Sequence, residues 1–166
     1  MEQINIAGVV PESIVDGPGL RFTVFVQGCP HKCKGCHNPE THSFDKINLV
    51  TIQDLVKSFK NNPLLSGITI SGGEPFAQAK GCSLLAKEAK EAGLSVWVYT
   101  GYTLEELTGI DAPEHSKELL DYTDVLIDGR FMVEKRTLNK RFAGSTNQRL
   151  IDINKWRDTG KITELI

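Results

Sequence analysis

Several residue types and sequence features are scarce in this chain. Cysteine, tryptophan and methionine number four, two and two in 166 residues. No apolar run approaches the length of a membrane-spanning helix, and the segment 1–10 holds no lysine or arginine, unlike a secretory signal. The formal net charge is only -2, so charge does not indicate nucleic acid or an anionic membrane as a partner. We therefore expect a cytoplasmic protein that binds neither nucleic acid nor membrane.

The chain also lacks internal repeats, low-complexity tracts and an obvious linker. Hydrophobic residues make up 40% and charged residues 24%, which is ordinary for a folded globular protein. A length of 166 residues fits one domain, so residues 1–166 are expected to form a single unit. The absence of a GxxxxGK[ST] run excludes a P-loop nucleotide site.

Short apolar strands alternate with amphipathic helices along the chain. Strands are predicted at 22–26, 67–71, 94–100 and 124–128, with a fifth candidate at 149–153. Helices are predicted at 51–61 and 78–92, with a short one opened by a capping box at 103–106 and a weaker one at 115–121. This alternation is typical of βαβ units in a parallel sheet. We expect an α/β fold, a partial, open parallel (β/α) barrel of about five to six strands rather than a closed barrel.

Three of the four cysteines gather in one loop, Cys29, Cys33 and Cys36, with C-x3-C-x2-C spacing. The loop follows the first predicted strand, which places it at the carboxyl end of a parallel sheet, where active sites are built. Thiolates suit iron–sulfur clusters and zinc. Because a cubane cluster usually takes four cysteines, three would leave one iron open to bind a substrate directly. Cys82 stands apart on an apolar helical face and is predicted to be a core residue.

A zinc knuckle is the alternative interpretation of this loop, with His31, His37 or His42 as a fourth ligand. Zinc sites usually pair a C-x2-C unit with a second, distant pair. The chain has no second pair, which favours the cluster. A zinc-binding interaction module without catalysis nevertheless stays open at this point.

A second loop, Gly72-Gly73-Glu74, ends the strand predicted at 67–71. Glycine allows the backbone to approach a ligand closely, and Glu74 supplies a carboxylate for a cation such as an ammonium group. A Gly-Gly pair alone is more often a simple turn. Its position one helix after the cysteine loop favours a role in binding.

At these residues the chain resembles the radical-SAM superfamily, whose motifs are C-x3-C-x-aromatic-C and a GGE that binds the ammonium of S-adenosylmethionine. The resemblance implies a barrel of radical-SAM type, a [4Fe-4S] cluster on the three cysteines and S-adenosyl-L-methionine as cosubstrate. Gly35 stands at the family's aromatic position, and glycine lets the backbone of Gly35, Cys36 and His37 approach the adenosine. Asn38 follows in the same motif and is placed with them at the cofactor.

Further motifs narrow the resemblance. The segments 16–21 (DGPGLR), 35–41 (GCHNPET) and 144–149 (GSTNQR) are similar to glycyl-radical-enzyme activases, in particular those acting on anaerobic ribonucleotide reductase. The resemblance implies reductive cleavage of S-adenosylmethionine to a 5′-deoxyadenosyl radical, which takes hydrogen from a glycine of the reductase catalytic subunit. It also implies a flavodoxin-like electron donor. A pyruvate formate-lyase activase or a carboxy-deazaguanine synthase type of enzyme is the alternative.

Three features keep two interpretations each. The segment 16–19 is either part of the site or a plain β-turn. Asp128, at the end of a predicted strand, either faces the cofactor or caps the next turn. The basic segment 134–149 is either a solvated surface or a docking surface for the reductase, which charge reversal of Lys140 and Arg141 would test.

Overall fold

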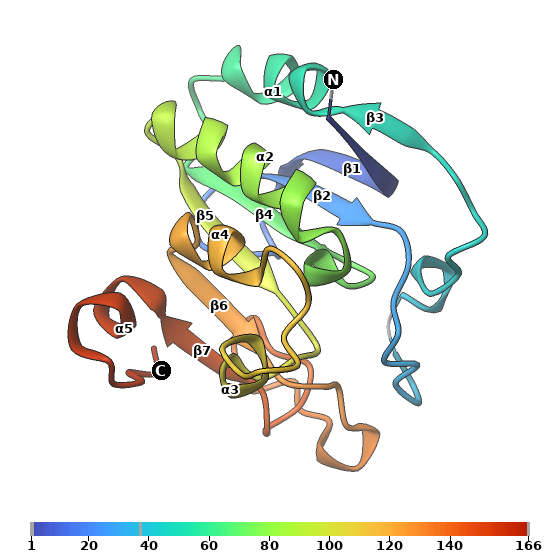
Figure 1. The fold of residues 1–166 in the computed structure, drawn as a ribbon, viewed down its shortest axis with the longest axis vertical. Coiled ribbons are helices and arrows are strands. Elements are labelled where there is room, and N and C mark those ends of the chain that lie inside the picture. The colour runs from blue at the N-terminus through green and yellow to red at the C-terminus, as the bar shows by residue number, and fades with distance from the viewer. Residues whose placement is uncertain (1, 37, 166) are drawn as a thin grey trace.

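A seven-stranded sheet forms the centre of the molecule, with the order β3-β1-β2-β4-β5-β6-β7 (Figure 1). This computed structural model describes residues 2–36 and 38–165. The strands are β1 (Gln3–Ser13), β2 (Arg21–Val26), β3 (Leu49–Thr51), β4 (Gly67–Gly72), β5 (Ser95–Tyr99), β6 (Val125–Asp128) and β7 (Arg149–Asp152). The helices are α1 (Ile52–Lys60), α2 (Ala79–Glu91), α3 (Leu104–Leu107), α4 (Ser116–Asp121) and α5 (Ile153–Thr159), with 3-10 turns η1 (Pro39–Thr41), η2 (Pro75–Gln78) and η3 (Val133–Lys135). None of the helices in these residues combines the length and the apolar character needed to cross a bilayer.

The central strands are parallel, as the alternation of strands and helices predicted. β2 pairs with β4, β4 with β5 and β5 with β6, each in parallel register. Helices α2 and α4 lie between successive parallel strands in the chain order. The α/β class and the open arrangement are confirmed, because β3 and β7 stand at opposite ends of the sheet order.

Both edges of the sheet differ from the expectation. β1 pairs antiparallel with β2 and β3, and β7 pairs antiparallel with β6, so the sheet has seven strands rather than five to six. The strand predicted at 149–153 is present beside β6, but it runs antiparallel and does not extend the parallel sheet. The segment between β6 and β7 contains only the turn η3, and an antiparallel neighbour needs no crossover helix. β1 was missed because much of it is exposed, so it lacks a continuous apolar pattern.

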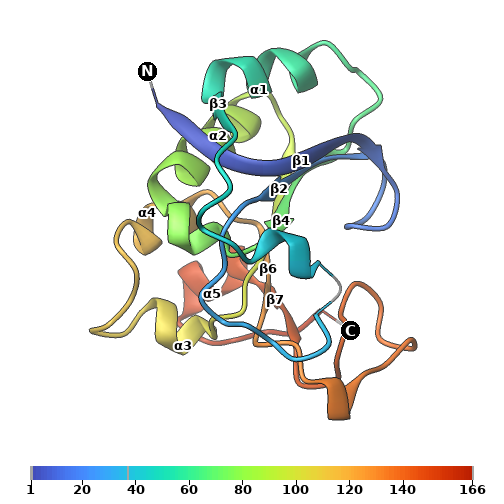
Figure 2. The ribbon, with the colours of Figure 1, turned by 90° about the vertical axis from the view of Figure 1, so that its right-hand side faces the viewer.

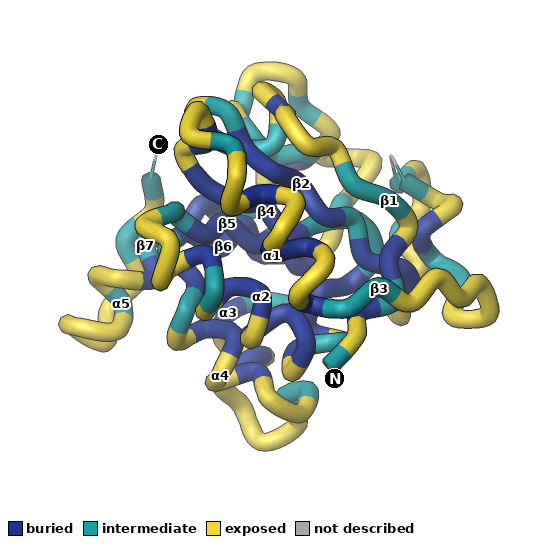
Figure 3. Tube along the Cα trace, turned by 90° about the horizontal axis from the view of Figure 1, so that it is seen from above, coloured by how far each residue is buried: buried dark blue, intermediate teal, exposed yellow. Residues whose placement is uncertain are grey.

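Three helices cover one face of the sheet. In Figures 1 and 2, α1, α2 and α4 lie on the same side of the strands. Ile68 and Ile70 of β4 and Val96 and Val98 of β5 are completely buried in the core that includes these helices. Cys82 of α2 belongs to the same core, as predicted. Figure 3 shows this burial concentrated in the central strands, with the exposed chain in the outer loops.

The sequence of α1 explains its place in this layer. Ile52, Leu55, Val56 and Phe59 recur at helical spacing, and all four are buried against the sheet. The Thr51 hydroxyl accepts a hydrogen bond from the Asp54 amide at 3.1 Å, which satisfies one of the free donors at the helix start. The predicted helix and its cap are confirmed.

The opposite face carries an arginine, Arg21, that is completely buried. Its guanidinium donates to the Thr69 hydroxyl at 2.8 Å and to the Ile68 carbonyl at 2.7 Å. It also donates to the Pro18 carbonyl at 3.2 Å, which ties the segment 16–19 to the sheet. Burial lowers the pKa of Arg21 to about 10, so the group stays charged at neutral pH. The segment 16–19 is therefore held against the sheet and is not a free turn.

Candidate functional site

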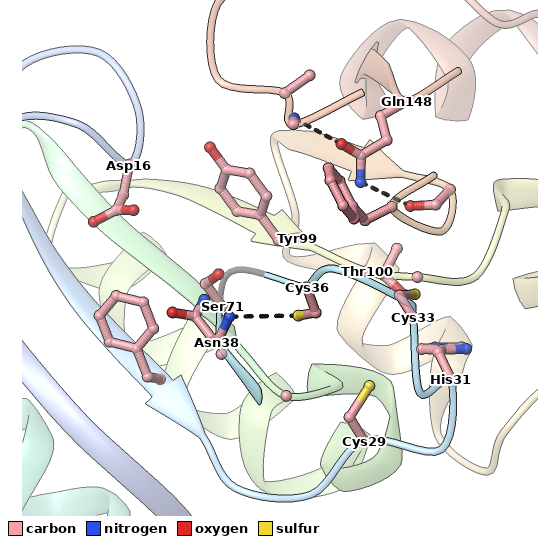
Figure 4. Close-up of a pocket in the computed structure, with 18 of the residues that line it drawn as sticks. Asp16, Cys29, His31, Cys33, Cys36, Asn38, Ser71, Tyr99, Thr100 and Gln148 are labelled. Atoms are coloured by element: carbon pink, nitrogen blue, oxygen red, sulfur yellow. Dashed lines mark hydrogen bonds between the residues drawn. The ribbon is translucent and has the colours of Figure 1, made fainter. Parts of the chain in front are cut away.

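A cavity of about 380 Å³ lies at the carboxyl ends of the parallel strands. This volume falls in the range of small-molecule sites. Its walls come from segments far apart in sequence, including the cysteine loop, the end of β4, the end of β5 and the chain between β6 and β7. Figure 4 shows Asp16 and Tyr99 on one side of it and the cysteine loop on another. The expected position of the site is thus where the structure places a cavity.

Cys29, Cys33 and Cys36 all line this cavity (Figure 4). The loop is held by the backbone that follows it: the Gly28 amide donates to the Thr41 carbonyl at 2.6 Å, and the Cys29 amide donates to the His42 carbonyl at 3.1 Å. The Cys36 sulfur accepts from the Asn38 amide at 3.5 Å. These hydrogen bonds fix the backbone of the loop, and all three thiols line the same cavity.

Burial raises the pKa of the Cys29 thiol and that of the Cys33 thiol. Both side chains therefore favour the protonated form in the chain by itself. Binding a metal requires thiolates, so loading of the loop releases protons.

The donor set fits a cluster that leaves one position free. The four cysteines are all free thiols, and only Cys82 lies away from the cavity, in the core. In the described part of the chain, no three His, Cys, Asp or Glu side chains converge on one point as ligands of a single ion. Three cysteines that each bind a different iron do not need to converge on one point.

Gly72 and Gly73 line the cavity where β4 passes the cysteine loop. A Cβ on Gly73 would lie 2.3 Å from the Gly28 carbonyl oxygen, and one on Gly72 would lie 2.6 Å from the Val26 nitrogen. Gly72 also has a φ of +96°, which side chains rarely adopt. The Gly-Gly pair is therefore required by close packing of two backbones, and it leaves its own backbone at the cavity wall.

Glu74 is completely buried and does not border the cavity. One carboxylate oxygen accepts from the Phe76 amide at 3.0 Å and from the Thr100 hydroxyl at 2.8 Å. The other lies 2.8 Å from the Gly101 amide nitrogen and 2.6 Å from His31 Nε2. The structure gives this carboxylate protein partners where the sequence indicated a ligand.

Asp128 is likewise buried and held by the protein. It accepts from the Leu104 amide at 2.8 Å, at the start of α3, and from Arg149 at 2.6 and 3.0 Å. Asp128, together with Glu105, holds the pKa of the Arg149 guanidinium above its usual value. Asp128 does not line the cavity, whereas its neighbour Gly129 does.

The remaining predicted positions lie near the end of the cysteine loop. Asn38 lines the cavity. Gly35 has a φ of +75°, and a Cβ there would lie 3.1 Å from a methyl carbon of Val133. His37 lies outside the described residues. The cysteine loop therefore packs against the segment after β6, which the sequence placed at the surface.

That segment supplies cavity residues that the sequence prediction missed: Phe131, Phe142 and Gln148. Gln148 donates to the Gly129 carbonyl at 3.0 Å and accepts from the Gly144 amide at 2.8 Å, which closes the segment on itself (Figure 4). Tyr99 of β5 was also missed; burial raises the pKa of its hydroxyl. The motif at 144–149 was the available signal, but nothing in it indicated which side chains face inward.

The fold and the cysteine site define a protein of the iron–sulfur class. The family described as "4Fe-4S single cluster domain" matches residues 15–151. The anaerobic ribonucleoside-triphosphate reductase-activating protein of Haemophilus influenzae is 34% identical over 87% of this chain and 96% of its own length. The protein of the same name from Enterobacteria phage T4 is 33% identical over 89% of this chain and 93% of its own.

The chain belongs to the family of anaerobic ribonucleoside-triphosphate reductase-activating proteins. This membership favours the iron–sulfur interpretation of the cysteine loop over the zinc knuckle. QueE from Escherichia coli, a solved structure, matches with a TM-score of 0.49 and 17% identity over 76% of this chain and 70% of its own.

Proposed function

We propose that this protein activates an anaerobic ribonucleotide reductase by forming a glycyl radical on its catalytic subunit. When bound, a [4Fe-4S] cluster would pass one electron from an external donor to S-adenosylmethionine, and cleavage of the sulfur–C5′ bond would give methionine and a 5′-deoxyadenosyl radical. That radical would take a hydrogen atom from the glycine and leave as 5′-deoxyadenosine. The observation that carries this proposal is the convergence of three free thiols and a Gly-Gly turn on one cavity. The names of relatives that match nearly along their whole length support it.

Cys29, Cys33 and Cys36 would hold the cluster and leave one iron for the amino and carboxylate groups of the cosubstrate. The backbone of Gly72 and Gly73 offers a surface that a ligand approaches closely. Cys36 and Asn38 line the cavity, and we place the adenosine beside them and the backbone of Gly35. His37 is assigned to the same region from its motif alone.

The chain's other contribution is to exclude water and competing groups from a radical. Phe25, Tyr99, Phe131 and Phe142 give the cavity an aromatic lining, and the segment after β6 forms one wall. We propose that the reductase segment carrying the glycine completes the remaining wall when it docks. A flavodoxin-like protein is the proposed electron donor, and the cytoplasm is the proposed compartment.

The segment 134–149 is our candidate for the docking surface. Lys135, Arg136 and Arg141 are exposed cations beside the cavity wall. Lys140 instead donates to the Gln148 carbonyl and so has a role within the segment. Charge reversal of Arg136 and Arg141 is therefore the cleaner test; complex formation that survives it would remove this surface from consideration.

The deciding experiment is anaerobic reconstitution with iron and sulfide, followed by metal analysis and a cleavage assay under strong reductant. We expect about four irons per chain and release of 5′-deoxyadenosine. Cys33→Ala should lose both, whereas Cys82→Ala, a cysteine in the core, should keep both. Addition of the reductase should then produce a glycyl radical visible by electron paramagnetic resonance.

The opposite result is equally informative. One tightly bound zinc per chain, with no iron uptake and no cleavage in the unmodified protein, would leave a metal-stabilised binding module. Cleavage without a radical on the reductase would retain the chemistry but point to another substrate.

A further inference from the structure

His31 lies inside the cysteine loop, between Cys29 and Cys33, yet its side chain is turned into the protein. The side chain is only 5% exposed. Its ring meets the Tyr102 ring edge-on, with centroids 4.5 Å apart and planes at 78°. A histidine in a surface loop would ordinarily be solvated, so this burial indicates a specific contact.

The contact is with Glu74, which has no exposure of its own. His31 Nε2 lies 2.6 Å from one carboxylate oxygen of Glu74. That carboxylate is also bound by the Gly101 amide and the Thr100 hydroxyl at the end of β5. A hydrogen bond to a buried carboxylate is among the stronger ones in proteins. The pair therefore fastens the cysteine loop to the framework of β4 and β5.

Gly101 packs directly against the His31 ring. A Cβ at this position would lie 2.4 Å from His31 Cδ2 and 2.7 Å from Nε2. Gly101 is not among the glycines with positive φ, so backbone conformation does not demand glycine here. The close approach of the imidazole ring is what requires glycine at this position, so the packing against Gly101 fixes where the ring lies.

The position of His31 matters for the first cluster ligand. His31 stands two residues after Cys29, so a fixed His31 side chain also restrains the backbone that carries this ligand. Lys32 has a φ of +51°, a left-handed conformation that a lysine adopts only when its surroundings impose it. With the His31 side chain fastened to Glu74, this strained backbone is held in place between Cys29 and Cys33.

We infer that His31 is a positioning residue: through Glu74 it holds the cysteine loop, and with it Cys29, in place for the bound cluster. Hydrogen bonds to the sulfurs and exposure to solvent are among the determinants of a cluster's reduction potential, and both depend on the position of the loop. Loss of the contact should shift the midpoint potential of the cluster and weaken its retention. This inference rests on the proposed cluster site.

The test uses the reconstituted full-length protein and three variants. In His31→Ala we expect a midpoint potential that differs from that of the unmodified protein. We also expect iron loss to a chelator to be about tenfold faster, the equivalent of one hydrogen bond to a charged group. His31→Gln, which retains a side-chain donor toward Glu74, should recover part of both effects. His115→Ala, at an exposed histidine before α4, is the control and should match the unmodified protein.

Two further variants, Glu74→Gln alone and combined with His31→Ala, separate the His31–Glu74 contact from general damage to the fold. If His31 acts through Glu74, Glu74→Gln and His31→Ala combined should cost less than the sum of the two single changes. Unchanged potential and chelator resistance in His31→Ala, or strictly additive effects, would overturn the inference. Absence of a cluster in the unmodified protein would instead refute the proposed function, so the two failures are distinguishable.

Discussion

The two faces of strands β4 and β5 differ sharply although they share the same backbone. Ile68, Ile70, Val96 and Val98 point to the covered face and are completely buried in the main core. Thr69, Ser71, Trp97 and Tyr99 alternate with them and point to the other face. Ser71 and Tyr99 line the cavity there. Alternate positions of one strand thus serve stability on one side and the site on the other.

The difference implies that neighbouring positions should respond differently to substitution. On the covered face the cost of a change is lost burial and a cavity in the core. On the open face the cost is lost polar contacts or an altered site, with less effect on the stability of the fold. Each of the following changes tests that division, beginning with the largest expected effect.

Ile70→Ala should lower the free energy of unfolding by about 2–5 kcal/mol, because it removes a completely buried side chain. Ser71→Ala, the next position on the same strand, should change it by about 0.5 kcal/mol or less. Urea unfolding followed by circular dichroism measures both. Equal losses at the two positions would contradict the division between the faces.

Arg21→Met should cost about 1.5–3 kcal/mol, because it leaves buried carbonyl and hydroxyl acceptors without their charged donor. It should also expose the segment 14–20 to limited proteolysis, since the bond to the Pro18 carbonyl is lost. Arg21→Lys is the matched control, because it keeps the charge with fewer donors, and its loss should be intermediate. A protease-resistant Arg21→Met protein would show that the segment is anchored by other contacts.

Thr103→Ala should lower the free energy of unfolding by about 1 kcal/mol through loss of the capping box of α3. Because α3 is also capped by Asp128, the effect should stay local and cluster retention should not change. Thermal unfolding and chelator challenge measure the two properties. A Thr103→Ala protein that loads no iron would place α3 within the site rather than beside it.

The smallest expected effect is on pH dependence and compares a group from each face. Burial raises the pKa of the Cys82 thiol above its ordinary value of 9.0 and that of the Tyr99 hydroxyl above 10.0. Above about pH 9 the unfolded chain loses protons that the folded chain keeps, so the free energy of unfolding should fall as pH rises. Below that pH the contribution is fully present.

Cys82→Ala and Tyr99→Phe should each reduce this alkaline decline, as seen in unfolding curves from pH 7 to about 10. If only Cys82→Ala does so, the Tyr99 hydroxyl ionises as readily in the folded protein as in the unfolded chain. That outcome would mean that water reaches the cavity face of the sheet but not the covered face. A reduction by both variants would mean that the two faces are similarly dry at these depths.

Much of the local structure and the location of the site followed from local patterns in the sequence. The four buried positions of α1 and its Thr51 cap involve residues within one helix, as does the capping box at Thr103. The cysteine spacing and its place after β2 predicted which end of the sheet carries the cavity. Such features depend on neighbours a few positions apart, which periodicity and capping rules describe.

Contacts between distant segments were beyond those rules. The pairing of β1 with β3, the pairing of β7 with β6, the buried Arg21 and the cavity wall after β6 each depend on a partner well separated along the chain. Glu74 and Asp128 show the same limit, because their acidic character was evident but their donors at Thr100 and Arg149 were not.

The sequence by itself therefore determined the helices, the parallel centre and the identity of the proposed cluster ligands. Only the tertiary structure decided that the Glu74 and Asp128 carboxylates accept hydrogen bonds from the protein itself, and that His31 contacts Glu74. The physical reason is that a buried charge takes whichever donors the fold brings within hydrogen-bonding distance, and that choice depends on the packing of the whole chain.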